Sequence, residues 1–351
     1  MNEIVDLYGH FGTERAGAAG GTLWCLVPQD LKLLSWRRRR PAVLILPGGG
    51  YSVCSDREAE VVAYPYLTAG YHAFVLRYSV AEHRTWPNPL NDYEHAMELI
   101  RANADEWNLM PDKIAVIGFS AGGHLAACAA TVAKNKPNAA ILGYAALELG
   151  IAQACQPGTE IIAPVDHIDG NTCPCFLFAA RDDNVVPIQN SLNFQSRLAK
   201  FGIQFESHIY AYGGHGFSTG APSVIGTGIC DRIPNWVNDS IGWLGDVLGC
   251  LTADGIGNPV CPAKIDGNNE MVLNVDCTLG YLQQQEQAQA VLAPVFGVID
   301  AVIRGRFTNV EGAYSVLRPA TLRSLMITIG KSGEDIASLD CLLRKIPNKK
   351  E

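Results

Sequence analysis

The sequence has few charged and few aromatic residues, and this already narrows the class of protein. Of its 351 residues, 18% are charged and 8% are aromatic, whereas 48% are hydrophobic. A disordered chain would have the opposite balance, with more charge and less apolar material. The 27 Lys and Arg residues are outnumbered by 35 Asp and Glu residues, which gives a net charge of −8. We therefore expect a globular protein that does not bind nucleic acid.

Long hydrophobic runs are also missing. An unbroken run of about 18 apolar residues is the usual mark of a membrane span, and none occurs, so we expect no membrane contact. The first residues, Met-Asn-Glu-Ile-Val-Asp, have no basic start followed by an apolar stretch. We therefore expect a cytoplasmic protein without a secretory signal.

Motifs for metals and cofactors are absent as well. The eleven cysteines include no Cys-x-x-Cys pair, and several lie in apolar stretches, where a reduced thiol packs as a small hydrophobic group. The sequence contains no His-Glu-x-x-His zinc pattern, and no Gly-Lys-Ser/Thr phosphate-loop pattern follows the glycine run at 48–50. We expect neither a metal nor another cofactor.

Six short apolar runs recur through the first 250 residues, with helical patterns at 91–106, 120–133 and 189–200 between them. Continuous apolar runs of this length suit strands buried on both faces of a parallel sheet. Strand and helix patterns that alternate predict an α/β fold with helices on both faces of a mostly parallel sheet. The runs lie at 42–46, 71–76, 113–118, 139–144, 175–180 and 205–210.

The composition changes near residue 248. The chain then becomes rich in Gly, Pro, Asn and Asp to about residue 267, and helical patterns follow at 279–293, 295–303, 321–329 and 336–346. We predict an α/β domain over residues 1–250 and a small helical accessory region over residues 251–351. These helices are too few for a large core, so we expect them to pack on the first domain or on a second subunit, the latter giving a homo-oligomer.

The pentapeptide Gly-Phe-Ser-Ala-Gly at 118–122 follows the third apolar run and opens an Ala-rich helical pattern. A strand, Gly-x-Ser-x-Gly and a helix together are typical of a nucleophile elbow, which raises a serine hydroxyl above the sheet. The pattern favours Ser120 as a nucleophile, the alternative being a glycine-rich turn that opens a helix. His124, one helical turn later, is expected to pack or cap rather than act as a base.

A serine hydroxyl is a weak nucleophile and needs a base, which in turn needs a group to orient it. Asp182 and Asp183 directly follow the fifth apolar run, and His215 lies between glycines after the sixth. The chain order Ser, Asp, His is the one used by this arrangement of strand and helix. From the residues alone, either aspartate fits the orienting role.

Backbone N–H groups are the usual donors to a developing oxyanion. Ala121 offers one, as the residue after the serine. The glycine run at 48–50 follows the first apolar run and offers the others, because glycine lets a backbone approach a substrate closely.

These motifs resemble those of the α/β-hydrolase superfamily and, more narrowly, those of acetylxylan esterases and related carbohydrate or feruloyl esterases. The resemblance covers about residues 20–247. It is carried by the segments 46–51, 57–60, 74–80, 111–114, 118–124 and 213–217.

By this resemblance Ser120 would be the nucleophile and His215 the general base. Asp183 would be the orienting acid through the Asp-Asn-Val-Val-Pro segment at 183–187, with Asp182 as the neighbouring alternative. The family also implies a function, which is the release of short acyl groups, acetyl above all, from a carbohydrate ester such as acetylated xylan fragments. The oxyanion hole would be formed by Gly49, Gly50 and Ala121.

Several alternatives stay open. The protein could be a feruloyl esterase or a general short-chain carboxylesterase. It could be an oligopeptidase-like peptidase, although such enzymes usually carry a large N-terminal propeller and only about 40 residues precede the first expected strand here. It could also be a catalytically inactive binding module. Two features depart from the family, since Pro47 stands where a histidine is frequent, and residues 145–172, where relatives place specificity elements, match poorly.

Overall fold

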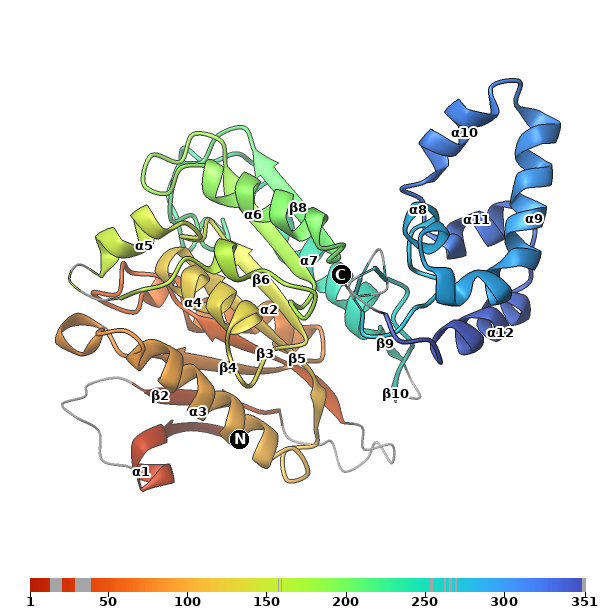
Figure 1. Cartoon of the computed structure of the whole chain (residues 1–351). Helices are drawn as coiled ribbons and strands as arrows, with labels where there is room; N and C mark the ends of the chain where they lie inside the picture. Colours follow the sequence, from red (N-terminus) through yellow and green to blue (C-terminus); the bar gives the residue numbers. More distant parts are fainter. Residues whose placement is uncertain are drawn as a thin grey trace. The chain divides into compact units, whose positions relative to one another are not determined.

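The fold is described from a computed structural model, shown in Figure 1. The residues it describes are 1–12, 21–28, 39–156, 158, 160–252, 255–261, 263–264, 267–268 and 270–348. The chain divides into two compact units. The first comprises Met1–Ala199 and Gln204–Ala263, and the second comprises Lys200–Ile203 and Lys264–Glu351.

An eight-stranded sheet forms the centre of the first unit, in the order β1-β2-β4-β3-β5-β6-β7-β8. The six strands from β3 to β8 are parallel, whereas β2 runs antiparallel to both β4 and β1. The strands are β1 (Asn2–Asp6), β2 (Thr22–Leu26), β3 (Arg40–Leu46), β4 (His72–Arg77), β5 (Leu109–Phe119), β6 (Ala139–Gly143), β7 (Cys175–Ala180) and β8 (Phe205–Tyr210).

Helices cover both faces of this sheet (Figure 1), as the alternating pattern predicted. On one face α2 (Glu60–Thr68) and α7 (Asn235–Leu248) share a core cluster with the strands, in which Tyr66 and Trp236 are fully buried. Helix α4 contacts β3, β5 and β6, and α3 packs on α4 and β5. The remaining bounds are α1 (Leu7–Phe11), η1 (Asp56–Glu58), η2 (Ala81–His83), α3 (Asn88–Ala102), α4 (Ser120–Thr131), α5 (Leu149–Cys155), η3 (Pro164–His167) and α6 (Gln189–Lys200).

The expectation that the sheet begins with the run at 42–46 is wrong, because β1 and β2 precede it. Strand β1 is almost wholly exposed, and β2 alternates between half-buried and buried residues before its last two buried positions. An antiparallel strand at a sheet edge needs only one buried face. A search for continuous apolar runs therefore misses β1, whereas β2 contains the apolar residues Leu23–Leu26 and was passed over.

The first unit continues beyond the end of α7. The N–H groups of Val260 and Cys261 donate to the carbonyl of Asp246, at 2.9 and 3.0 Å, and so return the chain to that helix. A small hairpin lies in the same stretch, formed by β9 (Leu251–Thr252) and β10 (Gly255–Ile256). Toward the C-terminus the first unit therefore extends to residue 263 rather than to 250, and Lys200–Ile203 also belongs to the second unit.

The second unit is helical, as predicted, and has a core cluster of its own that includes Leu279, Leu292 and Leu322, all fully buried. Because the unit is small, it can bury only a small apolar core. The helices are α8 (Leu279–Gln283), η4 (Glu286–Ala288), α9 (Gln289–Arg306), α10 (Val310–Leu317), α11 (Leu322–Thr328) and α12 (Gly333–Leu343).

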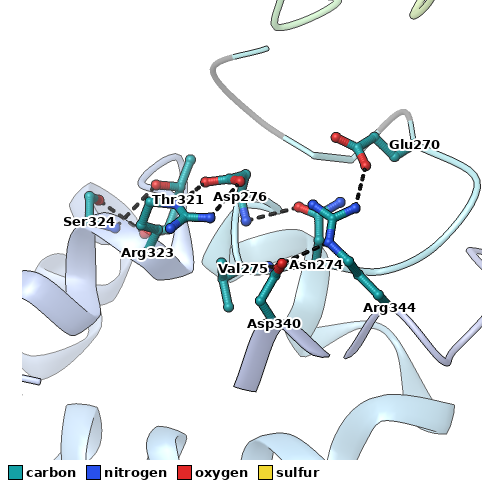
Figure 2. Close-up of polar contacts among 9 residues, drawn as sticks. All are labelled: Glu270, Asn274, Val275, Asp276, Thr321, Arg323, Ser324, Asp340 and Arg344. Atoms are coloured by element: carbon teal, nitrogen blue, oxygen red, sulfur yellow. Dashed lines mark hydrogen bonds and ion pairs between the residues drawn. The ribbon is translucent and has the colours of Figure 1, made fainter. Parts of the chain in front are cut away.

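Ionic hydrogen bonds join the segment at 274–276 to the last two helices of this unit, as Figure 2 shows. Arg323 donates to both carboxylate oxygens of Asp276, at 2.5 and 3.0 Å. Asp340 accepts the N–H of Val275 at 3.0 Å and the Nε–H of Arg344 at 2.7 Å. The segment thus has polar anchors on both α11 and α12 in addition to its apolar contacts.

Within the part of the chain that the structure describes, one helical stretch is long and apolar enough to cross a membrane by length and composition alone. It is Glu286–Arg306, with a mean hydropathy of 1.4. The search for an unbroken apolar run passed over it because Gln289 and Asp300 interrupt it. One face of this helix contributes Leu292 and Ile299 to the core of the second unit. The absence of a membrane partner stays a prediction.

Two of the arginine ion pairs of this unit, those of Arg323 and Arg304, give a test of its stability. Replacing Arg323 with alanine leaves the half-buried Asp276 without its bidentate partner. This should lower the free energy of unfolding by about 1–2 kcal/mol. Replacing Arg304, whose bond to Asp300 is exposed to solvent, should leave the stability of the unit close to that of the wild type. Amide hydrogen exchange of the intact chain should show about tenfold faster exchange in α11 and α12 for Arg323→Ala only. Equal effects of the two variants would contradict this account.

Candidate active site

Ser120 lies on a sharp turn between β5 and α4. Its φ of 51° is in the left-handed region, which non-glycine residues rarely adopt. A Cβ atom added to Gly122 would lie 2.1 Å from the carbonyl oxygen of Leu46, and one added to Gly118 would lie 2.2 Å from that of Gly122. Only glycine permits so close an approach of strand and helix. The two glycines of Gly-x-Ser-x-Gly therefore make the strained turn that presents the serine.

The structure brings Ser120 together with two of the residues singled out from the sequence. The Oγ atom of Ser120 lies 2.9 Å from Nε2 of His215. On the other side of the ring, Nδ1 lies 2.7 Å from Oδ2 of Asp183, whose side chain is fully buried. The three side chains form a continuous hydrogen-bonded chain from a turn after β5 through the loops after β8 and β7.

The neighbouring aspartates have different partners. Oδ1 of Asp183 accepts the N–H groups of residues 185–186, both at 2.9 Å, which leaves Oδ2 directed at His215. Oδ1 of Asp182 instead accepts the N–H groups of residues 213–214, both at 2.9 Å. Asp183 therefore contacts the imidazole of His215, whereas Asp182 binds the backbone of the loop that contains His215.

The glycine run after β3 lies beside the serine. Gly49, Gly50 and Ser120 line one cavity. Among the residues that the structure describes, no acceptor takes the N–H of Gly49 or Gly50. The N–H of Ala121 lies in the first turn of α4, where a helix offers no acceptor. Backbone donors without acceptors beside a hydroxyl are suited to stabilising a developing oxyanion.

The cavity has a volume of about 390 Å³, which is within the range of small-molecule sites. Part of its apolar wall comes from α5, through Ile151, Ala154 and Cys155. This helix lies in the stretch at 145–172 that departs from the family pattern. The part of the sequence that matches the family pattern poorly therefore forms part of the cavity wall. The other apolar lining residues are Ala146, Val185 and Val186.

Two polar residues of the site were missed by reasoning from the sequence. Glu58 is 3% exposed and lines the cavity, and it accepts a hydrogen bond of 2.5 Å from the hydroxyl of the buried Tyr144. Burial raises the pKa of Glu58, while the hydrogen bonds from Tyr144 and from the N–H of Gly48 lower it. No sequence signal marks Glu58 as buried, because a glutamate after an arginine ahead of a helix is typical of an exposed turn.

His124 has a structural role, as its position predicted. Its Nδ1 lies 2.7 Å from the hydroxyl of Tyr51, and its Nε2 lies 2.8 Å from the carbonyl oxygen of Ile162. Burial lowers the pKa of His124 to about 4, so the ring is neutral. A neutral ring that donates from Nε2 can accept the Tyr51 hydroxyl at Nδ1, and this bond ties the segment after the glycine run to α4.

In the described ranges, no three His, Cys, Asp or Glu side chains are grouped so as to hold a metal ion. All eleven cysteines are free thiols. The absence of a metal and of another cofactor stays a prediction.

Comparison with known proteins places these features in a family. The family model BD-FAE matches residues 34–149. The chain is 27% identical over 219 residues to an acetylxylan esterase from Xylanibacter ruminicola, which is 56% of this chain and 45% of that protein. It is 30% identical over 208 residues to endo-1,4-beta-xylanase B from Butyrivibrio fibrisolvens, which is 51% of this chain and 33% of that protein. The chain thus spans less than half the length of these two relatives.

Solved structures share both the fold and much of the sequence. An α/β-hydrolase enzyme from a Medee basin deep-sea metagenome library is 43% identical, with a TM-score of 0.60 over 65% of this chain and 92% of that one. An acetyl ester-xyloside bifunctional hydrolase from Caldicellulosiruptor lactoaceticus is 27% identical, with a TM-score of 0.56 over 63% of this chain and 86% of that one. With this identity across nearly all of a related enzyme, and with a strained serine turn on a mostly parallel sheet, the chain belongs to the α/β-hydrolase family.

Proposed function

We propose that this chain is a serine hydrolase of carboxylic esters. The observation that carries the proposal is the unbroken chain of hydrogen bonds from Ser120 through His215 to Asp183, which begins in a cavity with free backbone donors. Relatives named as an acetylxylan esterase and a probable carboxylic ester hydrolase support the same reaction. Four of the segments that resemble the esterase pattern, 46–51, 57–60, 118–124 and 213–217, contribute residues to this cavity.

In the proposed mechanism, Oγ of Ser120 attacks the carbonyl carbon of the ester while Nε2 of His215 takes its proton. The oxyanion receives hydrogen bonds from backbone N–H groups, and the alcohol leaves with the proton held by His215. Water then attacks the acyl-serine with His215 again as base, and the carboxylic acid is released. Asp183 stays ionised and stabilises the imidazolium in both steps. The backbone donors are those of Gly49, Gly50 and Ala121.

We further propose that the acyl group is small, acetyl above all, and that the alcohol is a carbohydrate such as a xylan fragment. The cavity wall is made of short aliphatic side chains, and the helix that closes part of it, α5, has only seven residues. A feruloyl group would need a flat slot of aromatic or long apolar side chains, and His215 contributes the one aromatic ring among the described lining residues. Relatives named for acetyl esters of xylan and xylosides support the carbohydrate part.

Removing the proposed nucleophile is the first test. Ser120→Ala should lower kcat for nitrophenyl acetate by roughly 10⁴-fold or more, because the acyl-enzyme cannot form. A fluorophosphonate should label the wild-type chain at Ser120 and leave the variant unlabelled, as peptide mass spectrometry would show. Normal turnover in the variant, or labelling at another residue, would refute the assignment.

The two aspartates offer a matched pair of substitutions. Asp183→Asn removes the charge that faces His215 and should lower kcat by roughly 10³- to 10⁴-fold. Asp182→Asn keeps an oxygen that can accept the two backbone N–H groups of the loop, so it should cost less than about tenfold. Steady-state kinetics on nitrophenyl acetate measures both. A reversed order would assign the orienting role to Asp182.

Acyl-chain preference tests the finer proposal. A pocket that bound long chains would gain about 0.8 kcal/mol, or about fourfold in kcat/KM, for each buried methylene. This cavity should instead give a kcat/KM that falls from nitrophenyl acetate to the decanoate, with acetylated xylo-oligosaccharides preferred over methyl ferulate. A steady rise with chain length would point to a lipase-like pocket, and a preference for the ferulate would favour the feruloyl alternative.

A further inference from the structure

A second carboxylate lies directly behind the proposed oxyanion donors. Glu58 ends the short helix η1, is 3% exposed, and is bound on two sides. Its Oε2 accepts the N–H of Gly48 at 2.9 Å. Its Oε1 accepts the hydroxyl of Tyr144 at 2.5 Å. One buried side chain thus joins the glycine run after β3 to the residue that follows β6.

The contact with Gly48 leaves no free space. A Cβ atom added there would lie 2.6 Å from Oε2 of Glu58, 2.8 Å from the carbonyl oxygen of Phe119 and 3.1 Å from Cβ of Ser120. Gly48 is therefore packed between the carboxylate and the turn of the nucleophile. Because Gly49 follows directly in the chain, the direction of its N–H depends on how Gly48 is held.

The contact with Tyr144 reaches the loop of the general base. The hydroxyl of Tyr144 accepts the N–H of Ser218 at 2.9 Å. The Tyr144 ring packs edge-on against the His215 ring, with 4.9 Å between centroids. The hydroxyl of Ser218 also donates to the carbonyl oxygen of Arg57, the residue before Glu58. Glu58 and its neighbours thus contact two segments beside the serine, namely the glycine run and the loop that contains His215.

Both carboxyl oxygens of Glu58 are engaged in hydrogen bonds. The oxygen of Tyr144 already accepts the N–H of Ser218, so its own proton is directed to Oε1 of Glu58. Oε2 is taken up by the N–H of Gly48. Both oxygens of Glu58 therefore accept hydrogen bonds. Burial raises the pKa of Glu58, and these two hydrogen bonds and the nearby His215 and Arg57 oppose that rise.

We propose that Glu58 is a positioning residue, which through Gly48 orients the oxyanion donors and through Tyr144 holds the loop of His215, so that both act on one substrate. The inference rests on the ester hydrolysis proposed above and assigns a task to the Arg-Glu-Ala-Glu segment at 57–60, which that mechanism does not use. A residue of this kind contributes to the transition state more than to the binding of the ester.

The test compares Glu58→Gln with Glu60→Gln, a control with the same change two residues later, where the carboxylate pairs with Arg77 outside the cavity. Glu58→Gln should lower kcat by about 10- to 100-fold with KM changed less than about threefold. It should weaken binding of a trifluoromethyl ketone, which forms a tetrahedral adduct with the serine, by the same factor as kcat. Glu60→Gln should leave all three values within about twofold of the wild type.

A second pair of variants guards against misfolding of Glu58→Gln. Tyr144→Phe keeps the ring against His215 but removes the hydroxyl between Glu58 and Ser218. It should also lower kcat, but by a smaller factor than Glu58→Gln. Tyr66→Phe, which removes a buried hydroxyl bonded to Ser240, is the matched control and should keep wild-type kinetics. Circular dichroism and thermal melting show that each variant is folded.

The split between kcat and KM, together with the affinity for the ketone, separates positioning from a merely structural role.

The outcomes separate the two proposals. A folded Glu58→Gln variant with wild-type kcat and ketone affinity would overturn the role of Glu58 alone. So would losses in Glu58→Gln that Glu60→Gln matches. A wild-type chain that hydrolyses no ester and does not react with the ketone would overturn the esterase proposal together with this one.

Discussion

The close approach of β5 and α4 is the constraint on which the rest of the site depends. The carbonyl groups of Leu46 and Gly122 lie where side chains at Gly122 and Gly118 would have to be, and Ser120 between them is held in the left-handed region. Such strain persists only where the surrounding fold over-determines the backbone. Here the fold does so, because β5 lies at the centre of the sheet and α4 is buried along almost its whole length.

From that turn the remaining groups follow from the topology. The carboxyl ends of parallel strands meet at one edge, so the segments after β3, β6, β7 and β8 all arrive near the serine. Each contributes one element, namely the glycine run, Tyr144, Asp183 and His215. Polar contacts behind them, from Asp182 to the histidine loop and from Glu58 to the glycine run, fix where these elements point.

Reasoning from the sequence reached the parts of this arrangement that leave local patterns. The buried parallel strands, the serine turn and the loop glycines around His215 each have a pattern of their own. It missed β1, whose apolar residues are mixed with Asn2, Glu3 and Asp6, and it passed over β2 although Leu23–Leu26 is apolar; it left Asp182 and Asp183 open until the family pattern was considered. It could not find Glu58, because the burial of a charged residue is decided by partners distant in the sequence, here Gly48 and Tyr144.

The central claim is that Ser120 carries the acyl group through a covalent intermediate, and trapping that intermediate tests it most directly. The wild-type chain would be mixed with nitrophenyl acetate, quenched in acid within the first turnover and digested for mass spectrometry. The account predicts a burst of nitrophenol of about one equivalent and one acetyl group on the peptide that contains Ser120. Turnover with no burst and no acetylated peptide, or an acetyl group on another residue, would contradict it.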